Sequence, residues 1–158
     1  MSRRYNGRRY RVVRPKRNAE RHIRAGSSVI ARNTQQTAYT YTATQACVVR
    51  SIKLDTGVTT GDTGNNGAVV YALVVVREGY NANALSWPAI TSDLYNPTAD
   101  VLMSGVLTDS AVEDHKANMV GRKLKAGDRL CLIYYYLDGD AGDTQVIVYF
   151  EMSFSVLT

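Results

Sequence analysis

Few side chains in this sequence have the types and spacing that enzymatic or metal chemistry requires. The only histidines are His22 and His115, and His115 stands directly after Glu113 and Asp114. A metal site there would need further ligands at helical spacing, and none is evident, so a solvated helix face is the simpler interpretation. The sequence contains no nucleophile elbow, phosphate-cradling glycine loop or paired-cysteine zinc pattern. We therefore expect neither an enzyme nor a cofactor.

A second acidic group lies near the C-terminus. Asp138, Asp140 and Asp143 are spaced loosely like the carboxylates of a calcium-binding loop. The segment lacks the third carboxylate and the distant glutamate that an EF-hand loop places around its ion. A hairpin turn is the favoured interpretation, and calcium binding is the alternative.

The chemistry that the sequence does support is polyanion binding by an arginine-rich N-terminal arm, residues 1–24. Ten basic side chains against Glu20 alone give the arm a net charge of +9, whereas nine basic and thirteen acidic side chains leave −4 on residues 25–158. Arginine binds phosphate with two hydrogen bonds and stacks on bases, as tyrosine also does. The predicted nucleic-acid-binding residues are Arg3, Arg4, Tyr5, Arg8, Arg9, Tyr10, Arg11, Arg14, Lys16, Arg17, Arg21 and Arg24.

The arm has too little apolar surface to offset its chain entropy, so we expect it to be disordered until a polyanion binds. Basic tails also serve as nuclear-localisation signals, or they attach proteins to ribosomes or to membrane surfaces. A nuclear-localisation signal is compatible with nucleic-acid binding. Membrane attachment is disfavoured, because the arm has no acylation motif and no regular apolar stripe.

The rest of the chain has the composition of one folded domain. Its 158 residues, 45% apolar and 21% charged, exclude wholesale disorder and fit a single core. Cys47 and Cys131 both fall within predicted strands, where a buried free thiol is expected.

Strand patterns follow one another after the arm. Residues 146–156 alternate apolar and mostly polar positions, and residues 68–76 are almost wholly apolar, as in an inner strand covered on both faces. Residues 37–54 contain neither proline nor glycine and predict one long or bent strand, with Tyr39 and Tyr41 on one face. Further strands are predicted at 29–32, 101–107, 119–125 and 129–137.

One helix and several long loops complete the prediction. Ser110 and Glu113 form a capping box, which favours a helix of about two turns over residues 110–118. Loops are expected at 55–67 and 79–97, which are rich in glycine, asparagine or proline. Seven or eight strands with one short helix indicate an all-β antiparallel sandwich or barrel. Parallel α/β folds need a helix after most strands and are disfavoured.

The tyrosines at 134–136 could be mistaken for a base-stacking platform. Consecutive residues of a strand point to opposite faces, so the three side chains cannot form one surface. Core packing is the favoured interpretation.

The layout resembles the small single-jelly-roll capsid proteins of circular single-stranded DNA viruses that encode a replication initiator, circovirus-like and nanovirus-like; satellite-virus coat proteins share the plan. The matching motifs are Arg-Arg-Tyr at 3–5, Arg-Arg-Tyr-Arg at 8–11 and Arg-Lys-Leu-Lys-Ala-Gly-Asp at 122–128. The resemblance implies an eight-stranded jelly roll over residues 25–158 joined to the arm, and a capsid protein of the virion.

The resemblance also implies a small icosahedral (T=1) shell of about 60 copies that packages single-stranded DNA and assembles in the host nucleus. Its partners would be other copies of itself and the viral genome, with nuclear import factors and a host receptor as further candidates and no membrane.

The alternative is a non-viral single-stranded nucleic-acid-binding β-barrel module. Such a protein should have basic and aromatic side chains on a sheet face. Here the body is net negative, and its one basic cluster is Arg122, Lys123 and Lys125. The shell-forming protein is therefore the favoured hypothesis.

Overall fold

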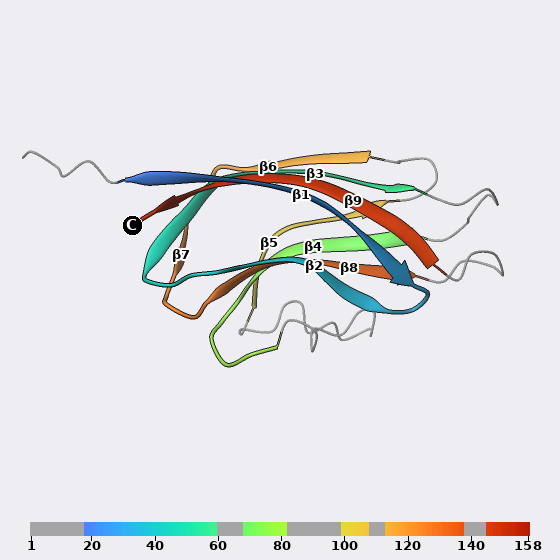
Figure 1. Cartoon of the computed structure of the whole chain (residues 1–158), viewed down its shortest axis with the longest axis horizontal. Coiled ribbons are helices and arrows are strands. Elements are labelled where there is room, and N and C mark those ends of the chain that lie inside the picture. Colours follow the sequence, from blue (N-terminus) through green and yellow to red (C-terminus); the bar gives the residue numbers. More distant parts are fainter. Residues whose placement is uncertain (1–17, 60–67, 82–98, 108–112, 138–144) are drawn as a thin grey trace, which may run out of the picture.

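The computed structural model of the chain describes residues 18–59, 68–81, 99–107, 113–137 and 145–158. These residues form nine β-strands (Figure 1) and no helix. The strands are β1 (Ala19–Ala31), β2 (Gln35–Thr42), β3 (Cys47–Thr59), β4 (Ala68–Val76), β5 (Ala99–Leu107), β6 (Glu113–Asn118), β7 (Arg122–Leu124), β8 (Arg129–Leu137) and β9 (Gln145–Leu157).

The strands make two sheets that lie face to face. Sheet A has the order β1-β9-β3-β6, with the short β7 also paired to β3, and sheet B has the order β2-β8-β4-β5. Every pair is antiparallel. The predicted all-β antiparallel sandwich is confirmed.

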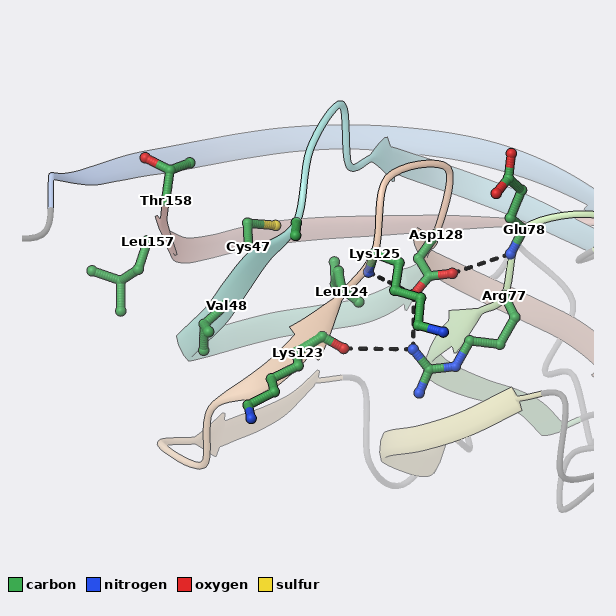
Figure 2. A pocket seen from close by; sticks show the side chains of 11 residues that line it. Cys47, Val48, Arg77, Glu78, Lys123, Leu124, Lys125, Asp128, Leu157 and Thr158 are labelled. Atoms are coloured by element: carbon green, nitrogen blue, oxygen red, sulfur yellow. Dashed lines mark hydrogen bonds and ion pairs between the residues drawn. The ribbon is translucent and has the colours of Figure 1, made fainter.

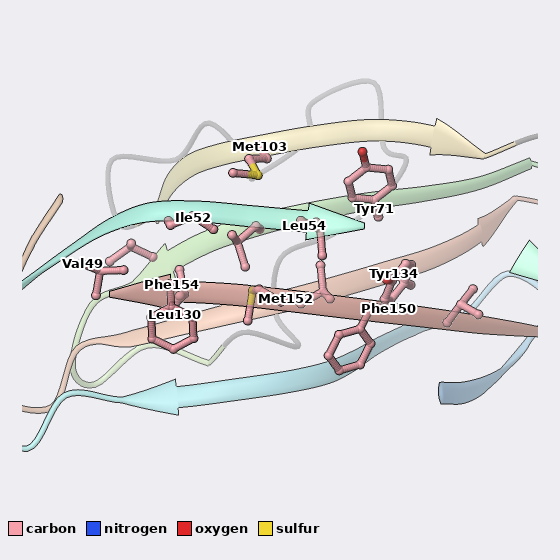
Figure 3. Close-up of a cluster of buried hydrophobic side chains, with 14 of the residues drawn as sticks. Val49, Ile52, Leu54, Tyr71, Met103, Leu130, Tyr134, Phe150, Met152 and Phe154 are labelled. Carbon is pink, nitrogen blue, oxygen red and sulfur yellow. The ribbon is translucent and has the colours of Figure 1, made fainter. Parts of the chain in front are cut away.

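The core fills the space between the sheets (Figure 3). The strand β9 follows its predicted alternation, since the side chains that it buries against sheet B are Val146, Val148, Phe150, Met152, Phe154 and Val156. Each fully buried side chain of this size stabilises the fold by roughly 1.5–3 kcal/mol. The face of sheet A that points away from this core is called its outer face below.

The strand β4 is an inner strand, as predicted. It lies between β8 and β5, and both of its faces are buried. Tyr71 and Leu73 face the core between the sheets, whereas Ala72, Val74 and Val76 form a second apolar cluster with Cys131 and Ile133. Cys131 and Cys47 are buried free thiols, which confirms the sequence interpretation.

The consecutive tyrosines of β8 also alternate as predicted. Tyr134 and Tyr136 belong to the core between the sheets, and Tyr135 is buried outside that cluster. Inside the core, Tyr134 Oη donates to Thr56 Oγ1 at 2.5 Å, and Thr56 in turn donates to the carbonyl of Tyr149 at 2.9 Å.

The single strand predicted over residues 37–54 is wrong. Residues 35–42 belong to sheet B and residues 47–59 to sheet A, so the chain changes sheets at a corner between β2 and β3. Ala43 is buried at this corner, where its N–H donates to the carbonyl of Asp128 at 2.9 Å. Because a distant segment holds this corner, the chain needs no glycine or proline there, and nothing in the sequence of residues 37–54 marks the end of one strand and the start of the next.

The helix predicted over residues 110–118 is also wrong for the part that the structure describes. Residues 113–118 form β6, which pairs with β3 from Ile52 to Gly57. A capping box is a local preference, and pairing with a strand about sixty residues earlier in the chain overrides it. The segment predicted as a strand at 119–125 contains only the three-residue β7.

The first strand is much longer than its predicted extent of 29–32. Strand β1 begins at Ala19 and pairs with β9 at thirteen positions, so the disorder predicted for the arm is wrong for residues 19–24. Most β1 side chains are exposed, as is typical of an edge strand that has one neighbour. Such a strand shows no core pattern in its sequence. Residues 1–17 and the aspartates 138, 140 and 143 lie outside the described residues.

Among the described residues there is no helix with the length and apolar character that crossing a bilayer requires.

Candidate nucleic-acid interface

Two of the predicted nucleic-acid-binding residues, Arg21 and Arg24, lie in the part of the chain that the structure describes. Arg21 stands opposite Ser155 and lies on the outer face of sheet A. Arg24 stands opposite the buried Met152, on the other face, and interacts with the hydroxyl of Tyr39. Burial raises the pKa of Tyr39, and the nearby Arg24 partly offsets this rise. The two arginines therefore point to different sides of the sheet.

The start of β1 is anchored by His22. Its ring stacks on Phe154 with centroids 4.9 Å apart and planes 8° from parallel, and it makes a T-shaped contact with the Tyr41 ring, with centroids 5.2 Å apart. Because His22 is the fourth residue of β1, its packing fixes the start of this strand on the sandwich. Figure 1 shows this point at the same end of the molecule as the C-terminus and β7.

A β-bulge in β3 brings two more cations to the outer face. Arg50 pairs with Ser155 and Lys53 with Ser153, and the register shifts between them. Residues three apart in a regular strand point to opposite faces. The extra residue of the bulge, with Ser51 at a φ of 55°, places both cations on the outer face.

Lys123 completes this group from β7. It stands opposite Val48, two residues before Arg50, so it shares the outer face. Arg21, Arg50, Lys53 and Lys123 are all exposed and are called the cationic patch from here on. Ser153 and Ser155 of β9 lie between its two sides.

The basic cluster that the sequence suggested at 122–125 is divided by the fold. Arg122 stands opposite the core residue Val49, on the face away from Lys123. Lys125 belongs to the turn that precedes β8, and its backbone N–H donates to Asp128. One member of this cluster therefore joins the patch.

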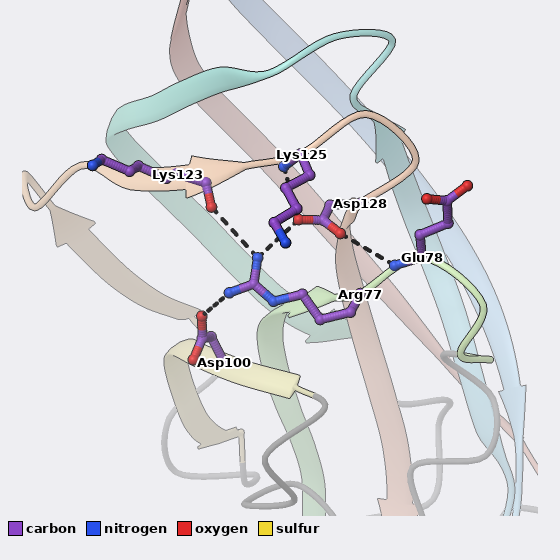
Figure 4. A network of polar contacts seen from close by, with 6 residues as sticks. All are labelled: Arg77, Glu78, Asp100, Lys123, Lys125 and Asp128. Carbon is purple, nitrogen blue, oxygen red and sulfur yellow. Dashed lines mark hydrogen bonds and ion pairs between the residues drawn. The ribbon is translucent and has the colours of Figure 1, made fainter.

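A polar network holds that turn against the end of β4 (Figure 4). Asp128 is 2% exposed and accepts hydrogen bonds from Arg77 Nη1 at 2.8 Å, Lys125 N–H at 2.9 Å and Glu78 N–H at 3.1 Å. Arg77 Nη2 also donates to Asp100 at 2.9 Å. Burial alone would raise the pKa of Asp128, but these hydrogen bonds together with the Arg77 charge lower it. The network therefore positions β7, and with it Lys123.

All residues of this network except Asp100 also line a cavity of about 970 Å³ beside Thr158 (Figure 2). Its walls include Cys47, Val48 and Leu157 as well as Arg77 and Asp128. Burial raises the pKa of the Cys47 thiol, which disfavours the nucleophilic thiolate. The Arg77 guanidinium is already paired with two carboxylates. The contacts of this network join the turn before β8 to the end of β4.

Next to the cationic patch, the charged side chains on the outer face are acidic rather than basic. Asp55 and Glu151 stand directly opposite each other in β3 and β9, and His115 Nδ1 lies 2.7 Å from Asp55 Oδ1. Within the described residues, no three His, Cys, Asp or Glu side chains are grouped so that they could hold a metal ion. One end of the face is thus cationic and its middle is acidic.

No family model matches the sequence, and no curated protein is similar to it. Among solved structures, the chain is similar to one of infectious bursal disease virus, Gt strain, at 7% identity and a TM-score of 0.43, over 90% of this chain and 33% of that one. A structure of the Gx strain is 10% identical, with a TM-score of 0.44, over 89% of this chain and 32% of that one. The crystal structure of the infectious bursal disease virus VP2 subviral particle is 10% identical, with a TM-score of 0.30, over 85% of this chain and 32% of that one. This chain spans about a third of the length of each. Identities and TM-scores this low establish nothing about its function, and they do not confirm the circovirus-like family.

Proposed function

We propose that the chain is the coat protein of a small virus, which assembles into a shell and packages single-stranded nucleic acid through its arm. The observation that carries the proposal is that the basic side chains are concentrated in the N-terminal segment, whereas the rest of the chain has a net negative charge. Eight of the nineteen basic side chains, and no acidic one, lie in residues 1–17, which leaves eleven basic and fourteen acidic side chains in residues 18–158. Residues 18–158 have a net charge of −3, so polyanion binding falls chiefly to residues 1–17, which are called the arm from here on.

The strand order supports a jelly roll. When β7 is counted apart, eight strands form two four-stranded antiparallel sheets, with orders β1-β9-β3-β6 and β2-β8-β4-β5. Except for β4 and β5, which follow each other in the chain, neighbours in each sheet are separated by other strands along the sequence, as two Greek keys folded together require. A rigid sandwich of this kind suits a subunit that must make the same contacts in every copy.

Exposed apolar side chains supply candidate contact surfaces for other copies. Met119 and Val120, between β6 and β7, are 68% and 61% exposed, and Tyr80 and Val106 are also more than half exposed. Large apolar side chains left in water favour burial against a neighbouring subunit. We infer that these residues lie in subunit contacts.

The finer parts of the proposal come from the resemblance in the sequence. They are a T=1 shell of about 60 copies, a single-stranded DNA genome, and a place in the virion with assembly in the host nucleus. Nuclear import factors and a host receptor would be further partners. The alternative, a single-strand-binding module, would need aromatic side chains for stacking. On the described outer face of sheet A, Tyr149 is the one tyrosine, phenylalanine or tryptophan, which disfavours it.

The test is to purify the full chain and measure its mass by sedimentation and its nucleic-acid content by absorbance. The expected result is a particle of about 1 MDa, from about 60 copies of 17.4 kDa, that contains nuclease-sensitive single strands. DNase and RNase digestion distinguishes the two genome types.

The matched control is a full-length variant in which the arginines and the lysine of residues 1–17 are replaced by glutamine. We expect it to fold and to lose its nucleic acid. A wild-type chain that remains monomeric at high concentration, yet binds single strands, would support the binding module instead.

A further inference from the structure

We propose that the cationic patch is a second phosphate-binding site, which holds single-stranded nucleic acid on the folded body beside the arm. This inference rests on the proposed function, since it assumes that the chain binds nucleic acid. It adds a site on the sandwich itself, assembled by residues from β1, β3 and β7. The basic residues of β3 form no cluster in the sequence.

The first argument is that the bulge of β3 aligns the cations. Without the register shift, Arg50 and Lys53 would point to opposite faces, and one of them would enter the core. Ser51 adopts a φ of 55°, a conformation that is sterically unfavourable for a residue with a side chain. Both cations thereby stand next to serines of β9.

The second argument is spacing. Arg21 and Arg50 face Ser155 from its two sides, so two strand spacings, about 10 Å, separate their backbones. Arginine and lysine side chains are long enough to reach one phosphodiester chain lying over β9 between them. The hydroxyls of Ser153 and Ser155 lie along that path and add hydrogen-bond donors for phosphate.

The third argument is that the patch cations are available. In the described part of the chain, the side chains of Arg21, Arg50, Lys53 and Lys123 take part in no hydrogen bond or ion pair, in contrast to Arg77 with its two carboxylates. Exposed cations without carboxylate partners keep their full charge for a ligand.

The fourth argument is the direction in which a bound nucleic-acid strand can run over the outer face. Asp55 and Glu151 occupy the next row of the outer face and repel phosphate, so they keep a bound strand at the end where β1 begins. That end is also where the arm joins the sandwich, because Arg21 is two residues after Ala19. A strand held by the arm can therefore continue onto the patch without crossing the acidic row.

The experiment measures binding of the full chain to a fluorescent oligothymidylate of about 20 nucleotides as salt is raised. For single strands, the logarithm of the binding constant falls with the logarithm of salt at about 0.7 per phosphate contact. The patch variant, Arg50→Gln with Lys53→Gln, removes two such contacts, so its slope should be smaller by about 1.4.

The matched control is Lys116→Gln with Arg129→Gln, which makes the same charge change away from the outer face, because Lys116 stands opposite the core residue Leu54 and Arg129 lies in sheet B. Its slope should equal that of the wild type. Urea unfolding of both variants checks that the fold is retained. Arg50→Lys should keep the wild-type slope, whereas the single Arg50→Gln variant should lose part of it.

The arm variant of the previous section separates the two proposals. If neutralising the arm reduces binding while the patch and control variants share the wild-type slope, the second site is wrong and the proposed function stands. If neutralising the arm leaves binding unchanged, the proposed function is wrong.

Discussion

At the scale of single residues, Asp128 is the clearest case of a side chain whose environment determines its charge. It is almost fully buried, yet three donors from Arg77, Glu78 and Lys125 converge on its two oxygens. Hydrogen bonds to a buried carboxylate stabilise the ionised form more than burial disfavours it here, so the pKa is lowered. A group with a lowered pKa in the folded state stabilises the fold above its unfolded pKa, about 3.9 for aspartate.

We predict that Asp128→Asn lowers the free energy of unfolding at pH 7 by on the order of 2 kcal/mol, because charge-assisted hydrogen bonds are lost. The wild type loses the same stabilisation as the pH falls from about 4 through the lowered folded pKa. The difference between the two proteins should therefore shrink at low pH. Urea unfolding at pH 7 and at about pH 3 measures both values.

The control for this prediction is Asp100→Asn. Asp100 also contacts Arg77 but is about half exposed, so its replacement should cost less than about 1 kcal/mol. Equal effects of the two substitutions at pH 7 would contradict the assignment of Asp128 as the centre of the network.

At the scale of elements, the bulge of β3 decides which side chains share a face. Residues 47 and 49 face the core before it and residues 52, 54, 56 and 58 face the core after it. The core-facing positions change from odd-numbered to even-numbered residues at Ser51. Ser51 has a positive φ, which its neighbours in the strand do not have. Without it, half of β3 would present its apolar side chains to water.

We predict that Ser51→Gly raises the free energy of unfolding by up to about 1 kcal/mol, because glycine adopts a positive φ without steric cost. Ser51→Val should lower it, since a β-branched residue is strongly disfavoured there. Denaturant midpoints for the two variants give the comparison. The control is Ser104→Gly in β5, at an exposed strand position whose φ is not positive, where the same substitution should be destabilising.

At the scale of the whole molecule, the basic segment of the sequence and the sandwich overlap in β1. This edge strand covers β9 along its full length, and His22 packs on Phe154 at its start. Residues 19–24 therefore belong to the sandwich, although the basic character of the sequence continues to Arg24.

We predict that removal of residues 1–17 changes the free energy of unfolding by less than about 0.5 kcal/mol. Removal of residues 1–31 should destabilise strongly and promote aggregation, because β9 would become a long exposed edge. Urea unfolding and light scattering distinguish the two truncations. A large loss of stability in the shorter truncation would show that residues 1–17 contribute to the fold.

The sequence by itself determined the fold class and the distribution of charge. Period-two alternation in β9, the apolar run of β4 and the buried cysteines are local properties that a strand retains in any antiparallel sandwich. The basic character of the arm depends only on composition. These features could be predicted because each is determined within a few neighbouring residues.

Only the tertiary structure decided which residues meet. The corner between β2 and β3 depends on Asp128, the strand β6 on pairing with β3, and the extension of β1 on pairing with β9. The cationic patch combines residues from positions 21 to 123, and a bulge that no glycine marks determines its composition. Pairing partners and register result from long-range contacts, so the residues of one segment do not contain them.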